Sequence, residues 1–187
     1  MANFNKKINE TNIRIGEVRF SYAHVFEPTA SKEGGEAKYS VAILWPKTAT
    51  AITKLVEEAV AAAKEKGKTS KWGGKIPANV KSPIRDGDID REDDPTYEGM
   101  YFMNCSSKQK PGIRVLENGQ VVEALDQEDF YSGCWGAITV NMFPYENSGN
   151  KGVAVGLNNV IKTRDDERLA GGATAEQDFS DLGDCLD

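Results

Sequence analysis

The stretch FYSGCWGAITVNMFPY, residues 130–145, has the clearest strand pattern in the chain. Successive side chains of a strand point to opposite faces, so the stretch divides into two sets. The first set is Cys134, Gly136, Ile138, Val140 and Met142, and the second is Trp135, Ala137, Thr139, Asn141, Phe143 and Tyr145. The first face is small and aliphatic, which suits a core. The second mixes large aromatics with polar groups, which suits a surface on which flat ligands stack.

Other segments repeat the strand pattern on both sides of this stretch. The phase of the alternation changes after Gly16, which predicts a β-bulge at Gly16–Glu17. Asn118–Gly119 is a strong signal for a type I′ hairpin, and residues 147–151 predict a tight turn. The predicted strands are 13–26, 38–45, 99–107, the two arms of the hairpin within 115–122, and 152–161. Successive hairpins of this kind favour an antiparallel sheet that closes into a small barrel.

One helix interrupts the strands. Apolar residues at helical spacing predict it over residues 49–66, with Thr48 or Thr50 as N-cap and Gly67 as its C-terminal stop. A long loop over 67–98 follows, basic in its first half and acidic over Asp86–Asp94. Connections of this length are usually functional or mobile. Residues 1–12 are polar, and we expect them to be loosely held.

The charge is distributed unevenly. Residues 165–187 contain eight acids and one base and therefore carry a charge of −7. The whole chain carries −6, so the remaining 164 residues carry +1. An acidic, glycine-containing segment with few apolar residues cannot bury enough surface to order itself. The sequence therefore predicts one domain over 1–164 and a flexible, disordered acidic tail over 165–187.

Several classes of protein are disfavoured. No apolar run approaches the roughly 20 residues that span a bilayer, and the N-terminus lacks the apolar core of a secretory signal, so we expect a cytoplasmic protein without a membrane partner. The three cysteines do not suggest a disulfide framework or a zinc site. No nucleophile motif accompanies His24, and no nucleotide-binding motif is present. We therefore expect that the protein is not an enzyme and binds neither a metal nor a cofactor.

Basic and aromatic residues alternate along the chain. Binding of single-stranded nucleic acid needs cations that follow the phosphates and aromatic faces on which bases stack. We predict that bases stack on some of Trp72, Tyr101, Trp135, Phe143 and Tyr145. We predict that phosphates contact Lys71, Lys75, Arg85, Lys108, Lys110, Arg114 and Lys151. The bland alternative is that the aromatics belong to the core and the lysines to a solvated surface.

The acidic tail has two candidate roles. It can compete with DNA for a basic groove, and it can dock replication or recombination proteins. The residues expected to carry docking are Asp178, Phe179, Asp181, Leu182, Asp184, Leu186 and Asp187. The simpler alternative is a tail that confers solubility.

The chain resembles a phage family of single-stranded-DNA-binding proteins with an OB fold. The resemblance is carried by PIRDGD at 83–88, YSGCWGAITVN at 131–141 and GNKGVAVGLNN at 149–159, and it extends over nearly the whole body. It implies an OB-like barrel that binds single-stranded DNA in phage replication or recombination, in the host cytoplasm. Related tails commonly end in an aromatic residue, whereas this one ends in Leu186-Asp187. The helix also lies after the second strand, whereas OB folds usually place it between the third and fourth.

Two other functions stay open. Residues 1–164 carry a net charge of only +1, which is low for a DNA-binding protein. This low charge favours a protein-interaction or recombination-accessory module that does not contact DNA. A metal-dependent nuclease built on Asp86, Asp88 and Asp90 is the third hypothesis. The sequence leaves open whether the chain forms a homo-oligomer.

Overall fold

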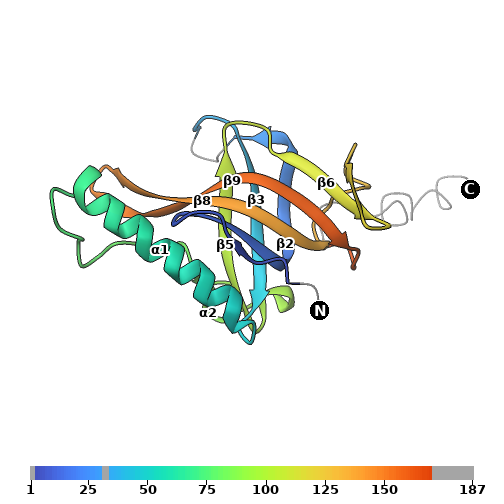
Figure 1. Ribbon diagram of the computed structural model, residues 1–187, viewed down its shortest axis with the longest axis horizontal. Coiled ribbons are helices and arrows are strands. Elements are labelled where there is room, and N and C mark those ends of the chain that lie inside the picture. Colours follow the sequence, from blue (N-terminus) through green and yellow to red (C-terminus); the bar gives the residue numbers. More distant parts are fainter. Residues whose placement is uncertain (1–2, 31–33, 170–187) are drawn as a thin grey trace, which may run out of the picture.

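The computed structural model describes residues 3–30 and 34–169, and its strands form one continuous sheet (Figure 1). The helical segments are α1 (Thr50–Ser70), α2 (Gly87–Asp90) and a 3-10 turn at Pro95–Tyr97. The strands are β1 (Lys6–Lys7), β2 (Asn12–Thr29), β3 (Lys38–Pro46), β4 (Arg85–Asp86), β5 (Met100–Ser107), β6 (Gly112–Glu117), β7 (Gln120–Glu123), β8 (Trp135–Asn147) and β9 (Asn150–Arg164).

Five of these strands close a barrel in the order β5-β3-β2-β8-β9, because β5 also pairs with β9. The neighbours run antiparallel except at β9, whose pairings with β5 and with β6 are parallel. The mainly β barrel with one main helix is therefore confirmed, and its sheet is mixed where we expected it to be purely antiparallel. As the sequence indicated, α1 follows the second barrel strand, β3.

The interior of the barrel contains the inward faces of these strands. Phe20, Trp45, Ile138 and Met142 are each at most 1% exposed. The predicted bulge is present, because the pairing of β2 with β8 shifts register between Gly16 and Val18. Both hairpin turns are also confirmed. Asn118 and Gly119 have φ of 51° and 77°, and Ser148 and Gly149 have φ of 50° and 82°, as type I′ turns require.

The expectation for residues 1–12 is wrong within the described part. Lys6 and Lys7 pair with Arg14 and Ile13 of β2. The guanidinium of Arg14 donates to the carbonyl of Phe4 at 2.7 Å, and the carboxamide oxygen of Asn5 accepts from the backbone N–H of Gly16 at 3.1 Å. The start of β2 leaves a free edge there, and the N-terminal segment covers it.

Helix α1 ends at Ser70 and not at Gly67, where the sequence predicted its stop. Gly67 is buried, and a Cβ placed on it would lie 2.6 Å from the Trp72 ring and 2.7 Å from Pro144. Its glycine therefore permits close packing against β8 and does not terminate the helix. Strand β8 is also shorter than predicted, because residues 130–134 form a turn in which Gly133 has φ of 113°.

We expect Gly67→Ala to destabilise the fold even though alanine is the better helix former. Helix propensity alone predicts a gain of about 1 kcal/mol, but the collisions with Trp72 and Pro144 cost more, typically about 1–3 kcal/mol for overpacking. Thermal or urea unfolding measures the sum. Lys68→Ala, at an exposed neighbouring position, is the control and should change stability by less than about 0.5 kcal/mol. A stabilised Gly67→Ala variant would contradict the packing role.

The loop predicted over 67–98 is held to the barrel at defined points. The backbone N–H of Lys81 donates to Lys151 O at 2.9 Å, and Val153 N–H donates to Lys81 O at 3.0 Å. Further along the loop, the ammonium of Lys47 contacts the carboxylates of Asp86 and Asp88 at 2.7 Å and 2.6 Å. The loop therefore carries short elements, β4, which extends the sheet beside β5, and the helix α2.

Candidate nucleic-acid interface

The outer face of β8 carries two aromatic side chains near its far end. Phe143 is 42% exposed, and Tyr145 is half-buried. Across the strand pair they face Ala154 and Gly152 of β9. A Cβ on Gly152 would lie 2.7 Å from the Tyr145 hydroxyl oxygen, so glycine lets this ring approach the backbone closely. The Tyr145 ring therefore covers the buried Gly152, and the face presents the exposed ring of Phe143 beside it.

These rings line a groove between β8 and the C-terminal end of α1. We call it the aromatic groove; its volume is about 620 Å³, and its lining residues are Lys66, Thr69, Ser70, Lys71, Phe143, Pro144, Tyr145 and Glu146. Figure 1 shows the long β8–β9 hairpin reaching that end of the helix. Three predicted residues, Lys71, Phe143 and Tyr145, are thus brought together. Lys66, near the C-terminal end of α1, lines the same groove.

The structure corrects the expectation for Trp72. The indole is only 7% exposed, packs on Gly67, and donates through Nε1 to the carbonyl of Tyr145 at 3.3 Å. It therefore supports the floor of the aromatic groove and does not offer a free face to a base.

A second groove lies further along the same outer face. We call it the amide groove; its volume is about 540 Å³, and its lining residues are Ile8, Asn12, Ser107, Gln109, Lys110, Thr139, Leu157, Asn158 and Asn159. Thr139 and Phe143 are four residues apart on β8 and point to the same side, so about 13 Å of strand separates the two grooves. Asn141 lies between them on that side. The predicted cation Lys110 belongs to this second groove.

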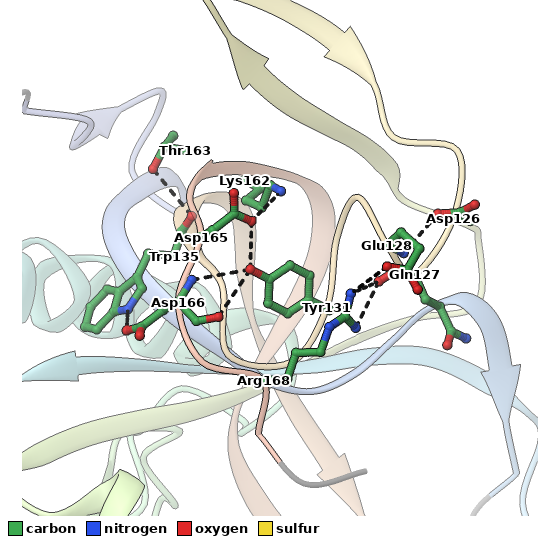
Figure 2. Close-up of polar contacts among 10 residues, drawn as sticks. All are labelled: Asp126, Gln127, Glu128, Tyr131, Trp135, Lys162, Thr163, Asp165, Asp166 and Arg168. Carbon is green, nitrogen blue, oxygen red and sulfur yellow. Dashed lines mark hydrogen bonds and ion pairs between the residues drawn. The ribbon is translucent and has the colours of Figure 1, made fainter. Parts of the chain in front are cut away.

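Trp135 lies at the opposite end of β8, where the chain after β9 returns to the barrel (Figure 2). Its indole Nε1 donates to a carboxylate oxygen of Asp166 at 2.8 Å. The guanidinium carbons of Arg164 and Arg19 lie 4.6 Å and 5.9 Å from the ring centroid. Trp135 is half-buried by these contacts, so its ring is not freely available for stacking.

Tyr131 and Asp165 extend this arrangement. The Tyr131 hydroxyl donates to Asp165 at 2.7 Å, Lys162 forms an ion pair with Asp165 at 2.6 Å, and the Arg168 guanidinium lies 4.2 Å from the Tyr131 ring centroid. We call residues 165–169 and these partners the tail latch. The start of the predicted flexible tail is corrected, because residues 165–169 pack on the barrel; residues 178–187, the predicted docking segment, lie outside the described residues.

The two carboxyls of the latch, those of Asp165 and Asp166, are ionised at neutral pH. The contacts of the latch lower the pKa of both carboxyls below 3.8, chiefly through Lys162 for Asp165 and through the Trp135 N–H for Asp166. The stabilisation from these carboxylates is therefore present above pH 3.8 and is lost as the pH falls through the lowered values. Burial, with the hydrogen bond to Asp165, raises the pKa of Tyr131 to about 12, so its phenol stays protonated.

The other predicted residues do not line either groove. Arg85 and Tyr101 lie on β4 and β5, where Arg85 stacks on Phe102 and Tyr101 packs on Trp45. Lys108 forms an ion pair with Glu36 at 2.9 Å, and Lys151 with Glu146 at 3.8 Å. Lys75 and Arg114 are exposed. The two ion pairs are on the surface and weak, so these lysines can still exchange partners.

The acidic segment around Asp86 and Asp88 is neutralised in part by Lys47. The two hydrogen bonds raise the pKa of the Lys47 ammonium, and Lys47 is also the chief cause of the lowered pKa of Asp88. The ammonium thus occupies the space between the two carboxylates where a metal ion of the nuclease hypothesis would bind. Residues 3–30 and 34–169 contain no group of three or more metal-ligating side chains.

The residues missed by the sequence reasoning are Lys66, Arg19, Arg164 and the amide side chains. Lys66 could have been found, because it precedes Lys71 on the same end of the helix. The positions of Arg19 and Arg164 beside the Trp135 ring could not have been predicted. They depend on the pairing of β2 and β9 with the two sides of β8.

No described helix is long and apolar enough to cross a membrane. Residues 11–186 match the family described as the ssDNA-binding protein of Enterobacter phage Enc34. Among curated proteins, the chain is 33% identical over 180 residues to a putative protein, p50, of Acyrthosiphon pisum secondary endosymbiont phage 1, covering 91% of this chain and 93% of that one.

Solved structures give the same relationship. The single-stranded DNA-binding protein of bacteriophage Enc34, in complex with ssDNA, superposes with a TM-score of 0.77 at 29% identity over 91% of this chain and 96% of that chain. The single-stranded DNA-binding protein gp2.5 of bacteriophage T7 shares the fold, with a TM-score of 0.50 at 17% identity over 92% and 94% of the two chains. The chain therefore belongs to the phage single-stranded-DNA-binding protein family of the Enc34 type.

Proposed function

We propose that this protein binds single-stranded DNA along the outer face of β8 and β9, without catalysis, during phage replication or recombination. The observation that carries the proposal is the aromatic groove, where the exposed ring of Phe143 lies beside Tyr145 and the ammonium groups of Lys66 and Lys71. The Enc34 relative, solved with ssDNA, supports it.

The chemistry follows from the two kinds of group in the groove. Bases stack on Phe143 and Tyr145, and each stacked base contributes about 1–3 kcal/mol. Phosphates approach Lys66 and Lys71 in the aromatic groove and Lys110 in the amide groove. Bases inside a duplex cannot offer their faces to these rings, so single strands bind more tightly than duplex.

The tail latch supports a role for the acidic tail in controlling access. Asp165 and Asp166 are anions held against Lys162, Arg19 and the Arg164-stacked ring of Trp135. A DNA phosphate would seek the same cations. We infer that the tail competes with DNA at this end of β8 and that DNA binding releases it, which leaves the more distal residues free to dock replication or recombination proteins.

The alternative function is a protein-interaction module that does not contact DNA. The low net charge of the body favoured it. Local charge matters more for binding than the total charge. The cations Lys66 and Lys71 line the aromatic groove, whereas the acids at 88–98 line a separate pocket at α2 and the loop after it.

Titration with an oligo-dT single strand and with a duplex of the same length tests the proposal. We expect tryptophan fluorescence to change on adding oligo-dT, because Trp72 supports the groove and Trp135 lies in the latch. Three to five phosphate contacts predict that log K falls with log salt with a slope of roughly −2 to −4. Equal affinity for single strand and duplex would contradict the proposed single-strand selectivity. No gel shift with single strands at low salt would favour the protein-interaction module.

A further inference from the structure

The amide groove differs from the aromatic groove in its chemistry. Its polar lining consists of the carboxamides of Asn12, Gln109, Asn158 and Asn159, two hydroxyls, and the ammonium of Lys110. The described lining contains neither a carboxylate nor an aromatic ring. Such a groove cannot stack a base, but it can form hydrogen bonds with the edge of one, as carboxamides do when they recognise unpaired bases.

Two of the groups that line it are already held in position. The Asn159 carboxamide oxygen accepts from Gly112 N–H at 3.0 Å, which leaves its NH₂ group as a free donor at the surface. Thr139 Oγ1 accepts from Asn159 N–H at 3.1 Å and so ties β8 to β9 beneath the groove. The groove therefore presents at least one fixed donor beside the mobile ammonium of Lys110.

Asn12 provides the complementary acceptor. Its Oδ1 is buried and is the one such side-chain atom in the described residues without a hydrogen-bond partner. A buried acceptor left unsatisfied is unfavourable. Asn12 lines the groove and is half-exposed, and its broad terminal torsion allows the oxygen to turn toward a ligand there. A ligand N–H group would satisfy it.

We propose that the amide groove is a subsite for the edge of one nucleobase that carries an exocyclic amino group next to a ring acceptor, with cytosine the best fit. The amino group donates to Asn12 Oδ1, and the ring nitrogen and carbonyl accept from Lys110 and from the Asn159 amide. A uracil or thymine edge presents a carbonyl where the amino group is needed. The inference rests on the proposed function, because it places a base about 13 Å of strand from Phe143 on the same DNA path.

Oligodeoxycytidine and oligodeoxyuridine separate this contact from stacking and charge. The two have the same backbone and nearly the same ring, and they differ at the hydrogen-bonding edge. We expect the wild-type chain to bind the cytidine oligomer about 5-fold more tightly, as expected for a partly exposed set of edge contacts. We expect Asn12→Ala to bind both oligomers with the affinity that the wild type has for the uridine oligomer.

Asn104→Ala is the matched control, because Asn104 is an exposed asparagine on β5 outside both grooves. It should keep the 5-fold preference, and melting curves should show that both variants fold. Equal wild-type affinities would overturn the inference while leaving the proposed function intact. A preference that survives in Asn12→Ala would also overturn it. Failure of the wild type to bind either oligomer would instead remove the proposed function itself.

Discussion

Replacing Phe143 by alanine together with Tyr145 by leucine should weaken binding to single-stranded DNA by at least about 30-fold, because two stacked bases contribute roughly 2–6 kcal/mol between them. Leucine at 145 removes the ring face but keeps an apolar group over Gly152, and the Tyr145 carbonyl that accepts from Trp72 belongs to the backbone. The fold should therefore survive. Fluorescence anisotropy with a labelled oligo-dT strand measures the loss.

Val121→Ala is the control for removing an exposed apolar group, since Val121 is 63% exposed on β7 and lines neither groove. It should leave affinity unchanged. Phe143→Trp in an otherwise wild-type chain should bind at least as well as the wild type, because it keeps a ring face at this position. If the double variant binds DNA like the wild type, the aromatic groove is not the binding site, whatever the rest of the surface does.

The barrel could be predicted because strands of alternating pattern and hairpin turns are local signals. Gly16 and Asn118–Gly119 were interpreted correctly for this reason: a change of phase and a type I′ turn are both decided by neighbouring residues. The parallel pairings of β9 were not predicted, because closure of a barrel depends on which distant edges meet.

In the candidate site, too, local signals could be predicted and long-range contacts could not. Phe143 and Tyr145 could be placed on the outer face of β8 because the alternation of the strand is a local signal; Phe143 is exposed there and Tyr145 is half-buried. The prediction that Trp72 is exposed for stacking was wrong, because its ring packs beside Gly67 and Pro144, which lie on other elements. The end of α1 was misplaced for the same reason: local propensity marks Gly67 as a stop, whereas tertiary packing uses it as a contact. Aromatic residues in a basic loop thus indicate a site only after their packing partners are known.

The tail latch was hidden from the sequence by its own composition. An acidic segment predicts solvation, and the one local partner is Lys162, three residues before Asp165. Its partners Arg19, Tyr131 and Trp135 lie between 31 and 148 residues away along the chain. The collision that a Cβ on Gly133 would make with the Glu167 carbonyl shows how closely the returning chain approaches the barrel. Anchoring fixes where the acidic tail begins, on the side of β8 that carries Trp135.

Neutralising the latch by Asp165→Asn with Asp166→Asn should therefore tighten binding to single-stranded DNA. Each removed charge near a phosphate contributes up to about 1 kcal/mol in water, so we expect roughly 5- to 30-fold at low salt and a smaller effect at high salt. Asparagine keeps the shape and some of the hydrogen bonding, so the change isolates charge. Anisotropy titrations at two salt concentrations measure it, and Trp135 fluorescence reports the loosened contact with residue 166.

The matched control is Glu92→Gln with Asp93→Asn, which removes the same two charges from the exposed acidic segment beside α2. A long-range effect of net charge would tighten binding equally in both double variants. A latch that competes for the cations at Trp135 predicts a much larger gain in the 165/166 variant, because only those carboxylates contact Arg19 and Lys162. Equal gains would mean that the latch affects binding only through net charge. No gain in either variant would show that residues 165 and 166 do not control access of DNA.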